Sequence, residues 1–191
     1  MLVPNKKPNR FRFLYLARHG QYGEDGSLTE LGTRQSRRLA RHLADKDIPL
    51  DRVWCSTMRR AEETADIVCA EAFPELEPSR SWLLRERLFP GLAVASDHDD
   101  DCSAALDVLD RIFRRWMRPS RSERHELLVC HGNVIRAIVT RCIDADVATS
   151  WHRMTIYHCS LTELACYDHD DYFLHGMNSH AFFPRELVTI V

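Results

Sequence analysis

The sequence predicts an α/β fold: a single three-layer α/β/α domain built around a mainly parallel sheet. Three short apolar runs, which begin near residues 13, 52 and 127, are each followed by a turn and then by a helical pattern. Strands that alternate with helices favour a parallel sheet with helices on both faces. The chain has 191 residues, of which 45% are hydrophobic, and this suits one core. We expect a basic N-terminal tail over residues 1–12 and one domain over residues 13–191.

The first strand is expected over residues 13–17, where apolar and aromatic residues suit a strand buried on both faces. It ends in Arg18, His19 and Gly20, and the glycine permits a sharp turn. This turn presents Arg18 and His19 at the carboxyl end of the strand, where open α/β sheets bind their ligands. Thr29 is the expected N-cap of the helix that follows. One side of this helix carries Leu31, Leu39 and Leu43.

The second strand–turn–helix unit is expected to begin with a strand at residues 52–55. A helix over residues 58–72 follows, and it ends before Pro74 because proline cannot continue a helix. Arg59 and Arg60 stand at the start of this helix. They are therefore expected close to the carboxyl end of the second strand.

The middle of the chain is less regular. Residues 75–81 predict a polar surface connection, and residues 82–86 predict another short strand or a strand end. Residues 89–101 contain proline, glycine and an acidic cluster, which predict an irregular excursion over the sheet edge. A strong helical pattern follows over residues 102–117, whose apolar positions share one face.

The third unit contains the clearest buried strand, at residues 127–130. It ends in His131, and Asn133 follows at the start of an apolar helix. Further strands are expected near residues 160–167 and 172–175. The third unit therefore adds a histidine to the polar residues that follow the first two strands.

Parallel strands place their carboxyl ends at one edge of a sheet, and ligands bind there. The residues expected to meet at this edge are Arg18, His19, Arg60 and His131. Guanidinium forks and imidazoles suit a compact multivalent anion, and phosphate is the obvious candidate. A neutral imidazole can attack phosphorus to form a phosphohistidine. The leaving group then needs a proton, for which Glu86 is the best-placed acid. The alternative is a surface ion pair of Glu86 with Arg85 or Arg87.

The motifs around these residues resemble those of a known family. In chain order they are LARHG at 16–20, LTELGTRQ at 28–35, STMRRAEETA at 56–65, LRE at 84–86 and CHGN at 130–133. Together they resemble the histidine phosphatase superfamily, which includes the phosphoglycerate mutases. Their occurrence in this order is far more specific than any single motif. The resemblance implies a phosphoglycerate mutase-like fold and a phosphoric monoester hydrolase.

The resemblance also implies a role for each site residue. His19 would be the phosphorylated nucleophile. The phosphoryl group would be clamped by Arg18, Arg60 and His131. Glu86 would donate a proton to the leaving group and would later act as the base for water. The residues expected to line the substrate pocket are Gly20, Gln21 and Asn133. This chemistry requires no metal and no cofactor.

Within the superfamily, the chain is most similar to the mitochondrial serine/threonine protein phosphatase branch, through residues 21–22, 83–86 and 133–136. This similarity implies a phosphorylated protein as the substrate. A small phosphorylated metabolite stays open as an alternative, and so does a protein that carries phosphohistidine. Residues 88–101 match the branch poorly, which leaves open a catalytically weak scaffold or binding protein.

The composition of the chain bears on its partners and on its cellular compartment. The net charge of −2 gives no general attraction to nucleic acid or to an acidic membrane. No apolar run reaches the length of a membrane span, and residues 1–12 lack the hydrophobic region of a signal peptide. Seven cysteines without a CxxC pair favour buried, reduced thiols, so we expect a cytoplasmic protein. A homo-oligomer is left open.

Two acidic runs each contain a histidine, one at His98 and one at His169. Such runs are usually solvated loops, and without a second set of ligands they make poor zinc sites. We therefore expect no metal at either run.

Overall fold

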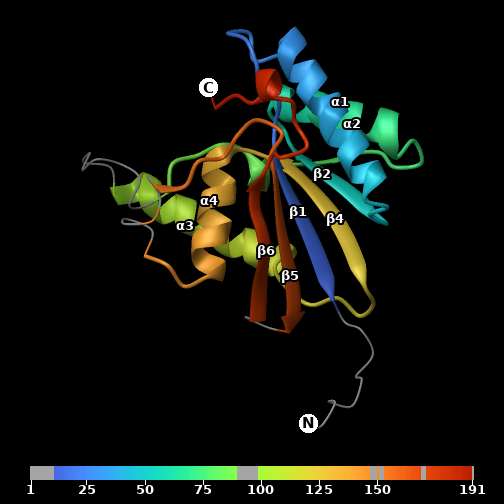
Figure 1. Ribbon diagram of the computed structural model, residues 1–191. Helices are drawn as coiled ribbons and strands as arrows, with labels where there is room; N and C mark the ends of the chain where they lie inside the picture. The colour runs from blue at the N-terminus through green and yellow to red at the C-terminus, as the bar shows by residue number, and fades with distance from the viewer. Residues whose placement is uncertain (1–10, 90–98, 147–149, 151–152, 169–170, 191) are drawn as a thin grey trace.

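The computed structural model describes residues 11–89, 99–146, 150, 153–168 and 171–190. Within this part of the chain, six strands form one sheet in the order β3-β2-β4-β1-β5-β6 (Figure 1). The strands are β1 (Arg12–Arg18), β2 (Arg52–Ser56), β3 (Ser79–Ser81), β4 (Arg124–Cys130), β5 (Leu161–Asp168) and β6 (Asp171–Ser179). The helices are α1 (Glu30–Asp45), α2 (Arg59–Ala72), α3 (Asp99–Arg115) and α4 (Gly132–Cys142), with short 3₁₀ helices η1 (Trp82–Leu84) and η3 (Arg185–Leu187).

The sheet is parallel on one side of β1 and antiparallel on the other. β1 pairs with β4, β4 with β2, and β2 with β3 in parallel, whereas β5 and β6 are antiparallel. Arg18, the last residue of β1, lies opposite Cys130, the last residue of β4. The residues that follow these two strands therefore emerge at the same edge. The expected α/β fold with a mainly parallel sheet is confirmed.

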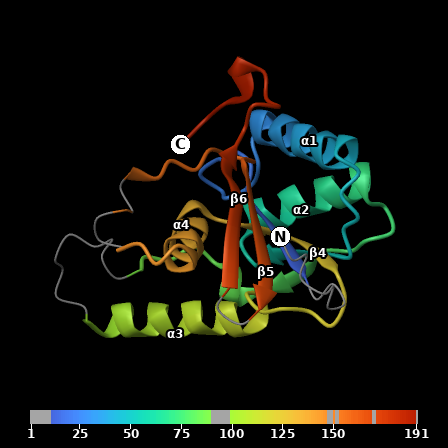
Figure 2. The same cartoon turned by 60° about the horizontal axis from the view of Figure 1, so that its bottom comes forward.

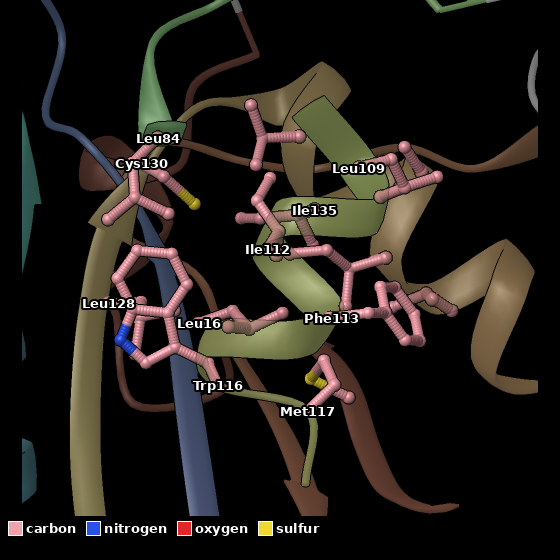
Figure 3. Close-up of a cluster of buried hydrophobic side chains, with 14 of the residues drawn as sticks. Leu16, Leu84, Leu109, Ile112, Phe113, Trp116, Met117, Leu128, Cys130 and Ile135 are labelled. Carbon is pink, nitrogen blue, oxygen red and sulfur yellow. The ribbon is translucent and has the colours of Figure 1, made fainter. Parts of the chain in front are cut away.

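Helices cover both faces of the sheet, which gives the expected three layers. α1 and α2 lie on one face, and α3 and α4 lie on the other (Figures 1 and 2). Side chains alternate along β1, and this alternation supplies both cores. Leu14 and Leu16 pack toward α3 and α4, and Figure 3 shows Leu16 facing Ile112 of α3. The alternate residues Tyr15 and Ala17 pack toward α1 and α2.

Local signals set the helix boundaries as expected. Thr29 is the N-cap of α1, and its side-chain oxygen accepts a hydrogen bond of 3.0 Å from the N–H of Gly32. α2 ends at Ala72, shortly before Pro74. The predicted strands near residues 160–167 and 172–175 are β5 and β6.

The start of α1 is packed against the loop after β1 with no room for a side chain between them. A Cβ atom on Gly32 would overlap the carbonyl oxygen of Gln21. A Cβ atom on Gly20 would lie 2.6 Å from the carbonyl oxygen of Gly32. Because these obstacles are backbone atoms, they cannot rotate away as a flexible side chain would. The two glycines therefore allow α1 to fix the loop directly after His19.

Gly32→Ala is expected to destabilise the protein by about 2 kcal/mol. Overpacking costs about 1–3 kcal/mol, and the better helix propensity of alanine offsets up to about 1 kcal/mol. The measurement is the free energy of unfolding in denaturant. Gly23→Ala is the matched control, because a Cβ atom there would meet only Asp25 Oδ1, at an ordinary 3.5 Å. Equal stability of the two variants would contradict the packing argument.

Two expectations for the middle of the chain differ from the structure. The predicted surface connection at residues 75–81 contains the edge strand β3, and the strand predicted at residues 82–86 is η1 with its flanking turns. β3 pairs with β2 through its backbone, with Arg80 opposite Cys55. Its three residues are polar and carry no hydrophobic alternation, so nothing in the local pattern marks them as a strand.

Some expectations concern residues outside the described part of the chain. These are most of the tail at residues 1–12, most of the excursion at residues 89–101, and the histidines of the two acidic runs, His98 and His169. Within the described part, Arg12 begins β1 and residues 99–101 begin α3, so the tail is shorter and the helix longer than expected. Of the helices that the structure describes, none has the length and apolar character needed to cross a membrane.

Candidate active site

The predicted site residues meet at the carboxyl edge of the parallel strands. Arg18 ends β1 and His19 follows it. Arg60 is in the first turn of α2, directly after β2, and His131 caps α4 after β4. The ring centres of His19 and His131 are 4.9 Å apart. Glu86 follows η1, and its Oε2 lies 3.6 Å from His131 Nδ1. The structure thus brings together the five side chains that the sequence singles out for chemistry.

His19 is a buried imidazole with one unprotonated nitrogen. Its Nδ1 lies 2.8 Å from the carbonyl oxygen of Gly20. Because a carbonyl only accepts, Nδ1 carries the proton and Nε2 holds a lone pair. The residue is 2% exposed, and burial, followed by the neighbouring His131 and Arg60, keeps the pKa of His19 well below its usual value. Nε2 therefore remains available as a nucleophile.

Arg60 faces this nitrogen directly. Its Nε donates a hydrogen bond of 3.0 Å to His19 Nε2. The guanidinium also lies over the ring of Tyr22, 4.3 Å from the ring centre. Arg59 points elsewhere: it is exposed, and its Nε lies 2.7 Å from the carboxylate of Glu63. An anion that approaches His19 would therefore meet the guanidinium of Arg60.

His131 is held in place by the serine that ends β2. Its Nε2 lies 2.9 Å from Ser56 Oγ. The residue is fully buried, and burial, followed by the positive charges of Arg60 and Arg18, lowers the pKa of His131 to about 2. Among the described residues, its Nδ1 has no hydrogen-bond partner. His131 is therefore a fixed, neutral imidazole whose second nitrogen lies on the side of Glu86.

Glu86 has the environment of a proton donor. Burial raises the pKa of this carboxyl to about 7, while the N–H of Asn133 and the positive charge of Arg18 limit the rise. Both protonation states are therefore populated near neutral pH, as a group that gives and later takes a proton requires.

The alternative ion pairs of Glu86 do not form within the described residues. Arg85 donates a hydrogen bond to Thr57 Oγ1, and Arg87 donates to the carbonyl oxygen of Trp82. Glu86 is therefore left to face the histidines at the sheet edge.

Arg18 is anchored by two carbonyl groups from late in the chain. One terminal nitrogen of its guanidinium donates to the carbonyl oxygens of Ile156 and Ile190, at 2.7 and 2.6 Å. Its Nε is buried and has no hydrogen-bond partner in the part of the chain that the structure describes. This Nε would lie 3.9 Å from a Cβ atom on Gly132, at the start of α4. The guanidinium is thus fixed on one side and keeps a buried donor on the other.

The three residues expected to line the pocket shape the loops around it. The N–H of Gly20 donates to Thr64 Oγ1 at 3.0 Å, and the N–H of Gln21 donates to Gln35 Oε1 at 2.8 Å. Asn133 lies in the first turn of α4, where the N–H groups of a helix favour an anion. Of the three, Asn133 has the position best suited to contact a bound anion.

His158 is a neighbour of the site that the sequence does not reveal. It is 1% exposed, and its ring centre lies 5.6 Å from that of His19. Its Nδ1 lies 2.9 Å from Thr189 Oγ1, and burial, followed by the charge of Arg18, lowers the pKa of His158 to about 3. Because β5 is antiparallel to β1, it begins at the edge where β1 ends. The only signal in the sequence is a histidine directly before a predicted strand.

A cysteine nucleophile and a metal centre are less well supported at this edge of the sheet. Cys130 directly precedes His131, but it is completely buried and burial raises the pKa of its thiol, which disfavours the thiolate that a nucleophile requires. In the described residues, no group of three or more histidine, cysteine or acidic side chains is placed to hold a metal ion. The arrangement suits a phosphoryl-sized anion held against an unprotonated imidazole, with an acid close by.

Comparison with known proteins finds a matching family model, related phosphatases and similar solved structures. The family model of the histidine phosphatase superfamily (branch 1) matches residues 14–92 and 95–180. The chain is 35% identical over 176 residues to the mitochondrial serine/threonine-protein phosphatase Pgam5 of Caenorhabditis briggsae, which covers 85% of the chain and 61% of that protein. It is 32% identical over 198 residues to the protein of the same name from Drosophila erecta, which covers 96% of the chain and 68% of that protein. A phosphoglycerate mutase structure from Plasmodium falciparum superposes with a TM-score of 0.67 at 25% identity, covering 95% of the chain and 99% of that structure.

The names of these relatives correct one expectation. The prediction of a cytoplasmic protein is wrong, because the matching relatives are described as mitochondrial. The cysteine argument distinguishes oxidising from reducing compartments only, so it could not make this distinction. The chain spans 61% and 60% of the length of the relatives from the two Caenorhabditis species.

Proposed function

The chain belongs to the histidine phosphatase superfamily, and on that basis we propose that it hydrolyses phosphomonoesters through a phosphohistidine at His19. The expected family and fold are confirmed, and the phosphatase names of the relatives support a phosphoric monoester hydrolase. The observation that carries the proposal is the unprotonated Nε2 of buried His19, 3.0 Å from the guanidinium of Arg60. An anion drawn to that guanidinium arrives at a nucleophilic atom. The proposed chemistry uses side chains alone and needs no metal or cofactor.

In the first step, Arg60 moves its hydrogen bond from His19 Nε2 to an oxygen of the phosphoryl group. Nε2 then attacks phosphorus in line with the ester oxygen, so that the N–P bond forms while the ester P–O bond breaks. The positive charges of Arg60 and Arg18 stabilise the three equatorial oxygens. The leaving oxygen takes its proton from the carboxyl group of Glu86, and the alcohol departs.

In the second step, water takes the place of the alcohol. Glu86 is now a carboxylate and removes a proton from the water as its oxygen bonds to phosphorus. The P–N bond breaks, and its electron pair returns to His19 Nε2. Inorganic phosphate leaves, and both His19 and the protonated Glu86 are restored for the next cycle.

The pKa of Glu86 predicts the pH dependence of the first step. The step needs the protonated carboxyl, which with a pKa of about 7 is present below that pH and is lost as the pH rises through it. His19 stays neutral over this range, because its pKa lies well below 6.5. We expect kcat/KM to fall above pH 7 by about tenfold per pH unit. The measurement uses an alkyl phosphate, whose poor leaving group needs the proton.

Glu86→Gln is the control for this profile. The amide does not titrate, so the falling limb should disappear while the overall rate decreases. The second ionisation of the substrate phosphate, near about pH 6, affects both proteins equally and cancels in the comparison. A falling limb that persists unchanged in Glu86→Gln would assign the titration to another group.

For the substrate, we propose phosphoserine or phosphothreonine on a protein. The support is the name of the matching relatives, which are serine/threonine-protein phosphatases at 35% and 32% identity. A small phosphorylated metabolite, a phosphohistidine-bearing protein and a weak scaffold are the competing outcomes. All of them share the anion-binding group around His19, so the substrate must be decided by assay.

The test is phosphate release from phosphoserine and phosphothreonine peptides, with free phosphoserine and an aryl phosphate measured beside them. The His19→Ala protein serves as the blank. Faster turnover of the peptides than of the small esters supports a protein phosphatase. Turnover of the small esters alone moves the assignment to a metabolite. No release from any ester in a folded protein would contradict the enzymatic proposal and favour the scaffold.

A further inference from the structure

A second basic pocket lies at the opposite edge of the sheet from His19. It is formed at the amino ends of β1, β2 and β4, close to the end of α3, and it has a volume of about 190 Å³. Five arginines line it: Arg12, Arg52, Arg115, Arg118 and Arg124. They come from four separate stretches of the chain, so this cluster is made by the fold rather than by a basic run in the sequence.

The positive charge of this pocket is only partly balanced. Its two carboxylates are Asp51 and Glu126. Asp51 lies 2.7 Å from the guanidinium of Arg124 and is used by that pair. Glu126 accepts a hydrogen bond of 2.8 Å from Trp54 Nε1 and lies 3.7 Å from Arg12 Nε. Among the described ion pairs, none involves the remaining arginines, which are Arg52, Arg115 and Arg118. The pocket therefore carries excess positive charge.

Two buried donors in the pocket wall make no hydrogen bond within the described part of the chain. Trp116 is 1% exposed, and its Nε1 has no hydrogen-bond partner in the described residues. Figure 3 shows this nitrogen on the side of the ring away from Ile112 and Phe113. The buried Nε of Arg12 faces the Glu126 carboxylate at 3.7 Å, which is too long for a hydrogen bond, so it donates none among the described residues. Buried donors are almost always satisfied in folded proteins, so two unsatisfied donors in one cationic pocket indicate an anionic ligand.

At the end of α3, the carbonyl groups that would repel an anion already accept hydrogen bonds from a cation. Carbonyl groups at the end of a helix are partly negative and repel anions. Here the carbonyl oxygens of Arg115 and Trp116 accept hydrogen bonds of 3.0 and 3.1 Å from the guanidinium of Arg12. Arg12 thereby neutralises the two acceptors that would otherwise oppose an anion. The guanidinium of Arg115 is held 4.9 Å from the ring centre of Trp54, which limits its freedom before binding.

We propose that this pocket is a binding site for a compact oxyanion, a phosphate group. Guanidinium forks match phosphate oxygens. A volume of about 190 Å³ lies below the range of about 300–1,000 Å³ of pockets that enclose drug-sized molecules. The site is separate from the active site, because Arg12 and Arg18 stand at opposite ends of the seven residues of β1. That separation is about 20 Å, at about 3.3 Å per residue.

The test is titration of the ¹⁵N-labelled protein with inorganic phosphate, followed by the indole N–H signals in ¹H–¹⁵N spectra. The chain has four tryptophans, and Trp116→Phe identifies the signal of Trp116. We expect a saturable shift of this signal that chloride at equal ionic strength does not cause. The shift should remain in Arg60→Ala, where phosphate binding at the active site is weakened.

Matched variants separate the pocket from general charge. Combined Arg115→Gln and Arg118→Gln should weaken phosphate binding at Trp116 by at least about tenfold. Arg114→Gln is the control, because its side chain is 78% exposed and does not line the pocket. An unchanged signal of Trp82, which does not line the pocket, verifies the fold. Arg52→Gln provides a second variant. The proposal is wrong if the Trp116 signal does not shift, or if it shifts equally in the control and the pocket variants.

A second arm identifies the source of the phosphate group. A phosphoserine peptide is titrated into the His19→Ala protein, which is expected not to hydrolyse it. A shift of the Trp116 signal with both the peptide and inorganic phosphate assigns the pocket to phosphorylated side chains. A shift with inorganic phosphate alone assigns it to the free anion. Both results support an oxyanion site and differ only in its ligand.

Discussion

Turnover is expected to disappear when His19 is replaced by alanine, with a loss in kcat of at least about 10⁴-fold. The variant lacks the nitrogen that we propose attacks phosphorus, so water would have to attack the ester directly. We expect that His131 does not substitute for it, because contact with Ser56 at 2.9 Å fixes its ring and its Nδ1 lies on the side of Glu86, 3.6 Å from Oε2. Binding of phosphate should persist in part, since Arg18 and Arg60 remain and keep their positive charge.

Two measurements test this expectation. Steady-state phosphate release gives kcat, and a labelled substrate shows whether phosphate is retained on the denatured protein. The wild-type protein should retain the label and the variant should not. Thermal unfolding shows that the variant is folded, because a buried imidazole has been removed. Near-normal turnover in a folded His19→Ala protein would contradict the proposed mechanism.

Arg60→Ala is expected to lower kcat by about 10²–10³-fold, the usual loss when one preorganised donor to a developing anion is removed. Arg60 is 9% exposed and donates directly to His19 Nε2. Its guanidinium is therefore both buried and placed beside His19 Nε2, where we propose that the phosphoryl oxygens bind. Arg60→Lys should restore little of the rate, because an ammonium group cannot present two parallel N–H donors.

Arg59→Ala is the matched control for this prediction. Arg59 is adjacent in sequence and carries the same charge, but it pairs with Glu63 and Asp25 at the surface. Its removal should leave kcat close to the wild-type value, since an exposed pair contributes little. Comparing kcat for the two alanine variants makes the test independent of net charge. A larger loss in Arg59→Ala than in Arg60→Ala would reverse the assignment of the phosphate-binding arginine.

The parallel part of the sheet was predictable because its strands are short apolar runs buried on both faces. Leu14, Leu16, Leu127 and Leu128 are fully buried, and this burial makes the runs continuous. β3 could not be predicted, since it is an edge strand of three polar residues without hydrophobic alternation that pairs with β2 through its backbone. The sequence also did not predict that β5 runs antiparallel to both β1 and β6. Strand direction depends on how the chain returns to the sheet and not on the residues in the strand.

The residues of the candidate site also differ in how far the sequence could predict them. Arg18, His19, Arg60 and His131 each follow a recognisable strand or begin the helix after it, so parallel topology was enough to bring them together. Glu86 was singled out by its order in the chain and by the family resemblance rather than by topology, because no clear strand precedes it. His158 and Ile190 depend on an antiparallel strand and on a terminal segment without a repeating pattern, and local signals do not encode such long-range contacts.

The position of β1 has a consequence for biosynthesis. β1 lies inside the sheet, yet its two neighbours are β4 and β5, which are made more than a hundred residues later. The carbonyl group of Ile190 that holds Arg18 comes 172 residues after it. A nascent chain therefore carries His19, the proposed nucleophile, next to a strand whose partners have not yet been synthesised. Arg18 reaches its anchored position only after Ile190 has been synthesised, long after the neighbouring His19.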